Sequence, residues 1–301
     1  MASTSPMKLP ALMLFTLLAL LGCERPQSGL PAGESSKAPI TASDGAGSGA
    51  WDNTFGPLIA TPSLENGVST LFMRDTTGST GVEVELFNHD GRVQRAILRP
   101  SEKLHSCAWE RASTLAWAAG APVPSGWSLA LAPGMATPIS VDDVSEFLSR
   151  DSTALVVDIR RLVSALPDDS TSLPFHGLPI SVRDAWRFRL ADDSTTIILA
   201  VTTRSLNVES NPRVEIVTIV AESNPATENG EWRTAFVQRD AGPEDRVAGP
   251  DLLAVLRLKN SRNTVALVRD GENGLAIDMV ERIAPASWRI RWSSSTLPCA
   301  R

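Results

Sequence analysis

A run of short apolar–polar alternations fills the second half of this sequence, and it constrains the fold more than any other feature. Alternation with a period of two predicts strands with one buried face, because successive side chains of a strand point to opposite sides. Turn residues separate eight such runs, which predicts mainly antiparallel sheet. The expected strands are residues 180–190, 195–205, 213–222, 231–239, 252–258, 264–269, 275–283 and 287–293.

The eight runs form two sets of four, and each set ends in a Trp-Arg pair, Trp232-Arg233 or Trp288-Arg289. This recurrence predicts an internal repeat of a four-stranded antiparallel unit over residues 180–240 and 251–294. The rhythm is similar to that of bacterial propeller-type repeats that carry Asp-rich calcium loops, but this sequence lacks the Asp-rich loop. Two units cannot close a propeller, so a sheet stack or sandwich is the expected arrangement.

The first half adds a hairpin and a helical segment. Residues 82–87 and 92–98 flank Asn88-His89-Asp90-Gly91, a turn sequence that predicts a β-hairpin. Residues 127–131 form another expected strand. The fold class predicted is therefore α+β, predominantly antiparallel β, with one central helical hairpin at about residues 141–166.

The helical hairpin is predicted from two capping residues. Ser140 would cap a first helix that ends at Arg150, with Asp142 and Asp143 in its first turn. Asp151 would cap a second helix, which Pro167 ends. The apolar residues of this second helix recur at helical spacing, which predicts one stripe facing a sheet. They are Leu155, Ile159, Leu162 and Leu166.

The N-terminus has the layout of an export signal. Lys8 precedes an apolar run over residues 9–21, which is shorter than the roughly 20 residues that a membrane-spanning helix needs. The run ends in Leu20-Leu21-Gly22-Cys23, which resembles the lipobox of bacterial lipoproteins. The alternative is an ordinary secretory signal followed by a coincidental cysteine.

The resemblance implies that residues 1–22 are removed and that Cys23 carries a diacylglycerol and an acyl chain such as palmitate. Such chains anchor a protein stably to a membrane.

Residues 23–50 are rich in Gly, Ser, Ala and Pro and are interpreted as a disordered tether. Residues 51–301 are expected to form a single, mainly β domain. Glu24 in place of Asp after the lipidated cysteine implies the outer membrane, or the periplasmic face, if the host is Gram-negative.

Charge and cysteine content limit the partners further. The chain of 301 residues has a formal net charge of −6, which argues against nucleic acid, and against an anionic membrane surface as the main partner. Besides Cys23 only Cys107 and Cys299 remain, and export favours a disulfide between them. Two separate buried thiols are the alternative. These two cysteines and three scattered histidines do not form a zinc pattern, and no cofactor is predicted.

Candidate site residues are few, because the sequence has no recognised catalytic motif. His176, in an ordered-looking loop, is the best catalytic candidate, with Asp184 or Asp168 to orient it. A second candidate is a groove for an anionic ligand on the polar face of residues 180–190. It would use Arg183, Arg187 and Arg189, and the same face in the last strand carries Arg289 and Arg291.

Both features also have structural interpretations. The arginines could form a solvated face paired with carboxylates. The tryptophans Trp186, Trp232, Trp288 and Trp292 could stack on sugars, but in alternating strands they are expected in the core. The function predicted is therefore a lipid-anchored, non-enzymatic binding or assembly module of the cell envelope, with an envelope protein as its partner. The alternative is an envelope hydrolase with a site around His176.

Overall fold

The computed structural model describes most of the chain from residue 82 onward and a few residues before it. The chain divides into a unit of residues 1–38 and a unit of residues 39–301, and all described residues belong to the second unit. The described residues are 55, 59–60, 82–91, 93–100, 113–116, 128–144, 150–168, 170–190, 194–207, 211–223, 231–260, 262–271 and 274–293.

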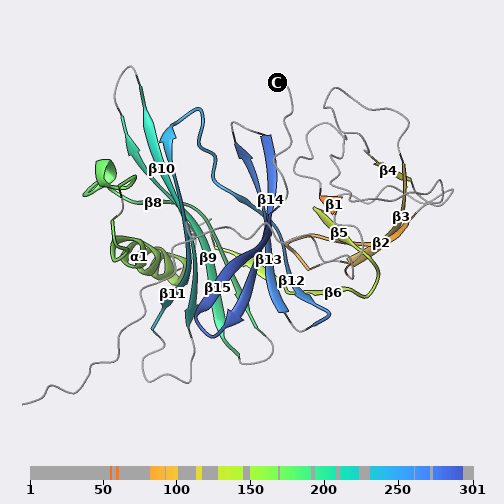
Figure 1. Cartoon of the computed structure of the whole chain (residues 1–301). Helices are drawn as coiled ribbons and strands as arrows, with labels where there is room; N and C mark the ends of the chain where they lie inside the picture. Colours follow the sequence, from red (N-terminus) through yellow and green to blue (C-terminus); the bar gives the residue numbers. More distant parts are fainter. Residues whose placement is uncertain are drawn as a thin grey trace, which may run out of the picture. The chain divides into compact units, whose positions relative to one another are not determined.

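Three antiparallel sheets of five strands each make up the described part of the chain (Figure 1). The first has the order β1-β5-β2-β3-β4, with β1 Ile59–Ala60, β2 Val82–Phe87, β3 Val93–Pro100, β4 Ser113–Ala116 and β5 Leu129–Leu131. The second has the order β11-β10-β9-β8-β7, with β7 Val141–Asp143, β8 Ser181–Arg189, β9 Thr196–Leu206, β10 Arg213–Ser223 and β11 Arg233–Pro243. The third has the order β15-β14-β13-β12-β6, with β6 Ala136–Pro138, β12 Asp251–Leu258, β13 Arg262–Gly271, β14 Gly274–Ala284 and β15 Ser287–Ser293.

The mainly antiparallel β prediction is confirmed, and all eight strands predicted in the second half are present with small shifts at their ends. Each predicted set of four strands forms one meander, and a short fifth strand extends each at the edge of its first strand. The β7 strand pairs with β8, and β6 pairs with β12. The chain therefore crosses from one sheet to the other between these two short strands.

The two meanders pack face to face as a sandwich. Their shared core holds Leu199 and Phe236 from one sheet and Val265 and Val280 from the other. Trp186 and Trp288 are buried in the same core, while Trp232 and Trp292 are partly buried against neighbouring clusters. The core expectation is therefore confirmed for two of the four tryptophans of the second half, while the other two are partly exposed.

One helix, α1 at Arg150–Ser164, covers the outer face of the β7–β11 sheet. Its predicted stripe is confirmed: Leu155, Ile159 and Leu166 are buried, and Leu162 packs beside them. Burying this apolar stripe against the sheet, more than the intrinsic propensity of so short a segment, holds the helix in place.

The predicted first helix of the hairpin is wrong. Residues 141–143 form β7, in which Val141 pairs with Phe188 and Asp142 pairs with Arg187. Ser140 lies before this strand and caps no helix. The two aspartates resemble the acidic first turn of a helix, but here they pair along the edge of β8 instead. Tertiary pairing therefore overrides the local helix signal.

Two β-bulges turn one end of β8 and one end of β15 to the opposite face of the sheet. In β8 the register shifts between Val182 and Asp184, so Val182 packs on the helix side whereas Trp186 faces the other sheet. In β15 Ile290 pairs with Val280 but Trp292 pairs with Met279, so Arg291 is the extra residue. Trp292 consequently packs on the opposite side of its sheet from Trp288. Strict alternation without a bulge would place Val182 on the same face as Trp186, and Trp292 on the same face as Trp288.

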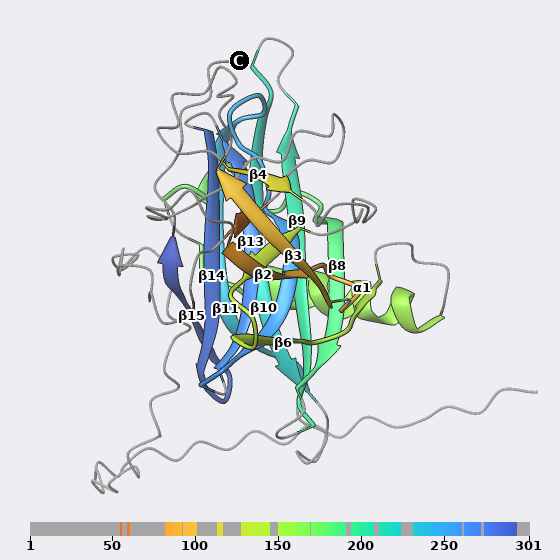
Figure 2. The same cartoon turned by 90° about the vertical axis from the view of Figure 1, so that its right-hand side faces the viewer.

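The sheet of β1–β5 packs on the other face of the β12–β15 meander, and Figure 2 views the molecule from this side. Phe87 and Leu129 contact the cluster that includes Leu256 and Met279.

The predicted hairpin of β2 and β3 is confirmed, and Gly91 takes a φ of +76° in its turn. That conformation favours glycine, as the Asp-Gly sequence predicted. Trp127 lies outside the described residues, and β5 begins at Leu129.

Candidate functional site

The structure separates the predicted catalytic candidates into two pairs. The Nδ1 atom of His176 lies 2.6 Å from Oδ2 of Asp168, while Asp184 forms an ion pair with its neighbour Arg183. The His176 side chain is 74% exposed. A carboxylate on Nδ1 can fix the tautomer of an imidazole. The pair lies at the surface, in the loop that contains the short 3₁₀ helix η2 (Leu173–Phe175), with exposed Leu173 nearby.

The three arginines predicted to line one groove have different surroundings. Arg183, at the β8 bulge, donates hydrogen bonds of 3.1 Å to the carbonyl of Pro250 and to Asp251. A Cβ on Gly249 would lie 2.9 Å from the guanidinium carbon of Arg183, so the guanidinium packs directly on the glycine backbone. Arg183 thereby ties β8 to the start of β12 in the other meander.

Arg187 and Arg189 lie further along β8. Arg187 contacts Asp142 of β7 at 3.4 Å, and Arg189 is exposed at the end of the strand. The bulge therefore directs Arg183 toward the second meander, while Arg187 pairs along its own sheet.

Glu222, at the end of β10, forms an ionic clamp between the meanders that sequence reasoning missed. Its carboxylate accepts hydrogen bonds from Nε and Nη2 of Arg282 on β14, at 2.7 and 2.8 Å. The indole N–H of Trp288 and the backbone N–H of Ala286 donate to the same carboxylate. Four donors therefore satisfy this buried charge, which makes its burial tolerable. We call this group the Glu222 clamp.

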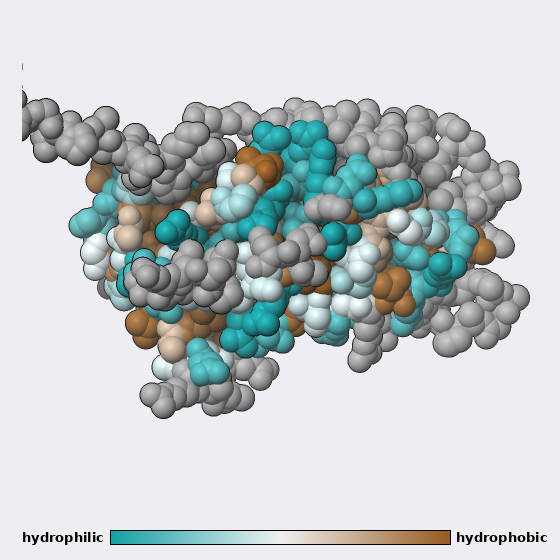
Figure 3. All heavy atoms as spheres, turned by 90° about the horizontal axis from the view of Figure 1, so that it is seen from below, coloured by the Kyte–Doolittle hydropathy of each residue, from teal (hydrophilic) through white to brown (hydrophobic). Residues whose placement is uncertain are grey.

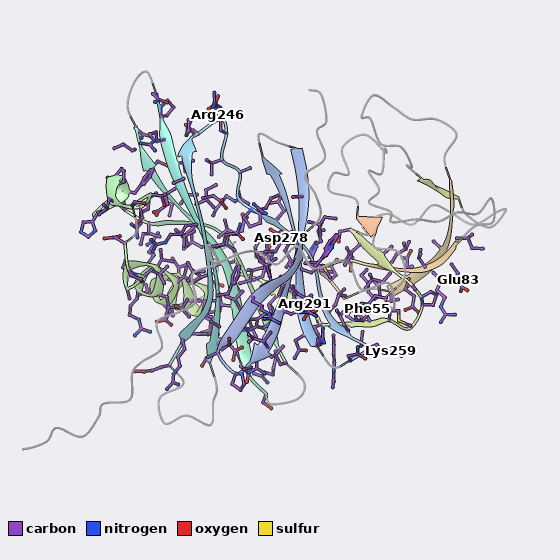
Figure 4. The ribbon with its side chains drawn as sticks, in the orientation of Figure 1. Phe55, Glu83, Arg246, Lys259, Asp278 and Arg291 are labelled. Carbon is purple, nitrogen blue, oxygen red and sulfur yellow. The ribbon has the colours of Figure 1, made fainter. Side chains whose placement is uncertain are left out.

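A second buried charged group lies further along the space between the meanders. Arg269 of β13 donates a 2.6 Å hydrogen bond to Asp278 of β14, whose side chain is fully buried. Asp278 is labelled among the strands of the sandwich in Figure 4. Asp240 of the facing β11 lies close enough to interact with both charges. Burial acts to lower the pKa of Arg269, but its hydrogen bond to Asp278 raises it overall. We call Asp240, Arg269 and Asp278 the interior triad.

Asp240 is the member of the triad whose charged form is disfavoured by burial. Burial raises the pKa of its carboxyl above the usual range, although Arg269 and a hydrogen bond from Gln238 act to lower it. A carboxyl that binds its proton more tightly in the folded state contributes stability below its unfolded pKa. This contribution is lost as the pH rises through the folded pKa.

Asp240→Asn should therefore lose less stability between about pH 4 and neutral pH than the wild type does. The amide keeps the shape of the protonated acid but cannot ionise, and each unit by which the pKa is raised corresponds to about 1.4 kcal/mol. Urea unfolding across this pH range measures the difference. Asp245→Asn changes an exposed carboxylate on the loop after β11 and serves as the control. An unchanged pH slope in D240N would show that Asp240 titrates normally.

The candidate functional site lies on the outer face of the third sheet, where three arginines surround one glutamate. Glu281 of β14 is 5% exposed and lies 3.5 Å from Nη1 of Arg262 on β13. Arg289 of β15 lies directly opposite Glu281 in the pairing of β14 with β15, and Arg291 follows at the bulge of β15. Burial raises the pKa of Glu281, although Arg262, Arg291 and Arg289 act to lower it. We call these four residues the arginine cluster.

The arginine cluster is a local surplus of positive charge on an acidic chain. Within the described residues, Arg262 is the one arginine of the three that reaches ion-pair distance of Glu281, and Arg289 and Arg291 are exposed. Arginine forks bind carboxylates and phosphates in a bidentate manner, so such a cluster is suited to an anionic ligand. Sequence alternation had singled out Arg289 and Arg291, but not Arg262 or Glu281, because these lie on different strands.

The remaining site predictions fall on other parts of the chain. Cys23, the predicted lipid site, and Cys107 and Cys299, the predicted disulfide, lie outside the described residues. Where the structure is described, no helix is both long and apolar enough to cross a membrane. The same residues contain no group of three or more acidic, cysteine or histidine side chains arranged to hold a metal ion.

Known proteins offer no independent guide to this site. Comparisons with protein-family models, with curated proteins and with solved structures find no match to the chain.

Proposed function

We propose that this chain is a lipid-anchored, non-enzymatic binding module of the bacterial cell envelope, which recognises its partner through the arginine cluster. The anchor would be the lipid on Cys23, after export and removal of residues 1–22. The tether of residues 23–50 would let the β domain reach a partner in the envelope. In a Gram-negative host, the protein would be anchored at the outer membrane or at the periplasmic face.

The observation that carries the proposal is the exposed charge of the arginine cluster. The buried charges of the Glu222 clamp and the interior triad have a structural role instead. The ion pair of the clamp joins the two meanders, and the ion pair of the triad joins neighbouring strands of one meander. Arginines and a bulge on an edge strand such as β15 also prevent edge-to-edge pairing. Arg262 lies on β13, an inner strand, so edge protection does not account for it.

An envelope hydrolase is the second candidate, and the 2.6 Å contact between His176 and Asp168 favours it. A carboxylate that orients an imidazole is a recurring arrangement in general-base catalysis. On this alternative, His176→Ala would abolish a hydrolytic activity that the wild type shows against envelope esters or glycosides. The exposure of the pair supports the binding module, because a catalytic base works best in a site that excludes water.

We further infer that the two meanders derive from one repeated four-stranded unit. The short strand at the first-strand edge of each meander occupies the equivalent place, which supports this inference.

The binding module predicts that capture of a partner in intact cells depends on both the anchor and the arginines. Full-length protein with a C-terminal tag is crosslinked in cells and purified, beside Cys23→Ser and the double variant R289Q/R291Q. Metabolic labelling with palmitate tests the anchor directly. We expect the wild type to carry the label and to retain a reproducible crosslinked component that both variants lose. Equal recovery from R289Q/R291Q would contradict recognition through the arginine cluster.

A further inference from the structure

The β14–β15 turn, next to the arginine cluster, exposes a short apolar segment. Ile283 is 46% exposed, and Ala284 and Pro285 are exposed after it. Ala286 completes the turn with a φ of +53°. We call residues 283–286 the apolar tip. Ile283 is the one large apolar side chain of this tip, and an apolar side chain beside basic residues can enter the interface of a membrane.

The Glu222 clamp holds the apolar tip rigidly. The backbone N–H of Ala286 donates a 2.8 Å hydrogen bond to Glu222, and Arg282, directly before the tip, makes a bidentate ion pair with the same carboxylate. Binding by a tip fixed in this way would cost little ordering entropy.

The arginine cluster lies immediately behind the apolar tip on the same strands. Arg289 pairs with Glu281, two residues before Ile283, and Arg262 reaches Glu281 from the next strand. Neighbouring strands are about 5 Å apart, so the three arginines lie within about 10 Å across the sheet. Figure 3 views the molecule from this end and shows hydrophilic residues, in teal, interrupted by smaller apolar areas, in brown.

We propose that the apolar tip and the arginine cluster together form a docking site for an anionic lipid surface. This inference rests on the proposed function and names the chemistry of its partner. The arginines bind the phosphates of lipid headgroups, and Ile283 and Pro285 enter the boundary between headgroups and acyl chains.

The net charge of −6 does not oppose this contact strongly, because it is spread over the chain. At physiological ionic strength the screening length is about 8 Å, so charges on distant strands contribute little at the tip. Glu281 lowers the local charge by one, but it is buried and pairs with Arg262. The docking is therefore local and directional, unlike the general membrane affinity of a basic protein.

The test uses vesicle co-sedimentation of residues 23–301, the chain expected after processing, with Cys23→Ser so that no lipid contributes. We expect binding to vesicles of phosphatidylglycerol but not to those of phosphatidylcholine. Each basic residue near an anionic surface contributes about five-fold in affinity, so R289Q/R291Q should bind on the order of 25-fold more weakly. Ile283→Ser, which keeps all charges, should also bind more weakly.

The matched control is R160Q/R161Q, which removes two exposed arginines from α1 and changes the net charge equally. We expect it to bind as the wild type does, and inorganic phosphate at millimolar concentration not to release the bound protein. Three results would overturn the proposal: no binding to phosphatidylglycerol, equal losses in the two double variants, or release by phosphate, which would indicate a site for free phosphate. If cellular capture still depends on Arg289 and Arg291 while vesicle binding fails, the binding module stands and its partner is a protein.

Discussion

Glu222→Ala should cost about 3–5 kcal/mol of the free energy of unfolding, because it leaves a buried charge without its partner. The guanidinium of Arg282, the indole N–H of Trp288 and the backbone N–H of Ala286 would all lose their acceptor. Arg282 and Glu222 are both largely buried, so water cannot readily replace the carboxylate. Urea unfolding monitored by tryptophan fluorescence measures the loss.

The control for this variant is Glu244→Ala, which removes an exposed carboxylate and should change stability by less than about 0.5 kcal/mol. A double-mutant cycle with Arg282→Ala isolates the ion pair: the double variant should lose less than the sum of the two single losses. A loss below about 1 kcal/mol in E222A would show that the clamp does not hold the meanders together.

Ile159→Ala should destabilise the protein by about 2–5 kcal/mol, the range for truncating a buried aliphatic side chain. Ile159 has no exposed surface and packs between α1 and the outer face of the β7–β11 sheet, with Val163 and Val217 in the same cluster. The cavity would open under α1, the only α-helix in the described residues, so α1 should also lose protection against amide hydrogen exchange.

Val157→Ala is the matched control on the same helix. Val157 is 59% exposed, and alanine is the better helix former, so stability should change little. Similar losses in the two variants would mean that α1 does not dock by its predicted stripe.

The strands of the second half could be predicted because turn residues separate short apolar runs, although β9, β10 and β12 bury both faces instead of the one face expected. The helix α1 could be predicted because its one buried stripe imposes helical spacing on its apolar residues. The bulges at Arg183 and Arg291 could not, because a single extra residue leaves no mark in composition, yet it moves Val182 and Trp292 to the opposite faces of their sheets. The short strand β7 was mistaken for the start of a helix because Ser140, Asp142 and Asp143 resemble a capped first turn. Only the pairing of this segment with β8 shows that it is a strand.

The site could be predicted only in part, for a similar reason. Arg289 and Arg291 stood out because they alternate with apolar residues in one strand. Glu281, Arg262 and the Glu222 clamp depend on residues that are distant in sequence, and the clamp joins positions 60 residues apart. A glutamate at a strand end followed by turn residues looks like an ordinary surface charge. Only the packing of one meander on the other identifies its partners.

The most direct test of recognition through the apolar tip and the arginine cluster is photocrosslinking in intact cells from two surface positions. One crosslinker replaces Pro285 on the apolar tip and the other replaces Val157 on α1, both of which are exposed. Our interpretation predicts strong crosslinking to an envelope component, with lipid expected, from position 285. This crosslink should be weak from position 157, and R289Q/R291Q should abolish it at 285. Equal crosslinking from both positions, or crosslinking at 285 that does not depend on the arginines, would contradict it.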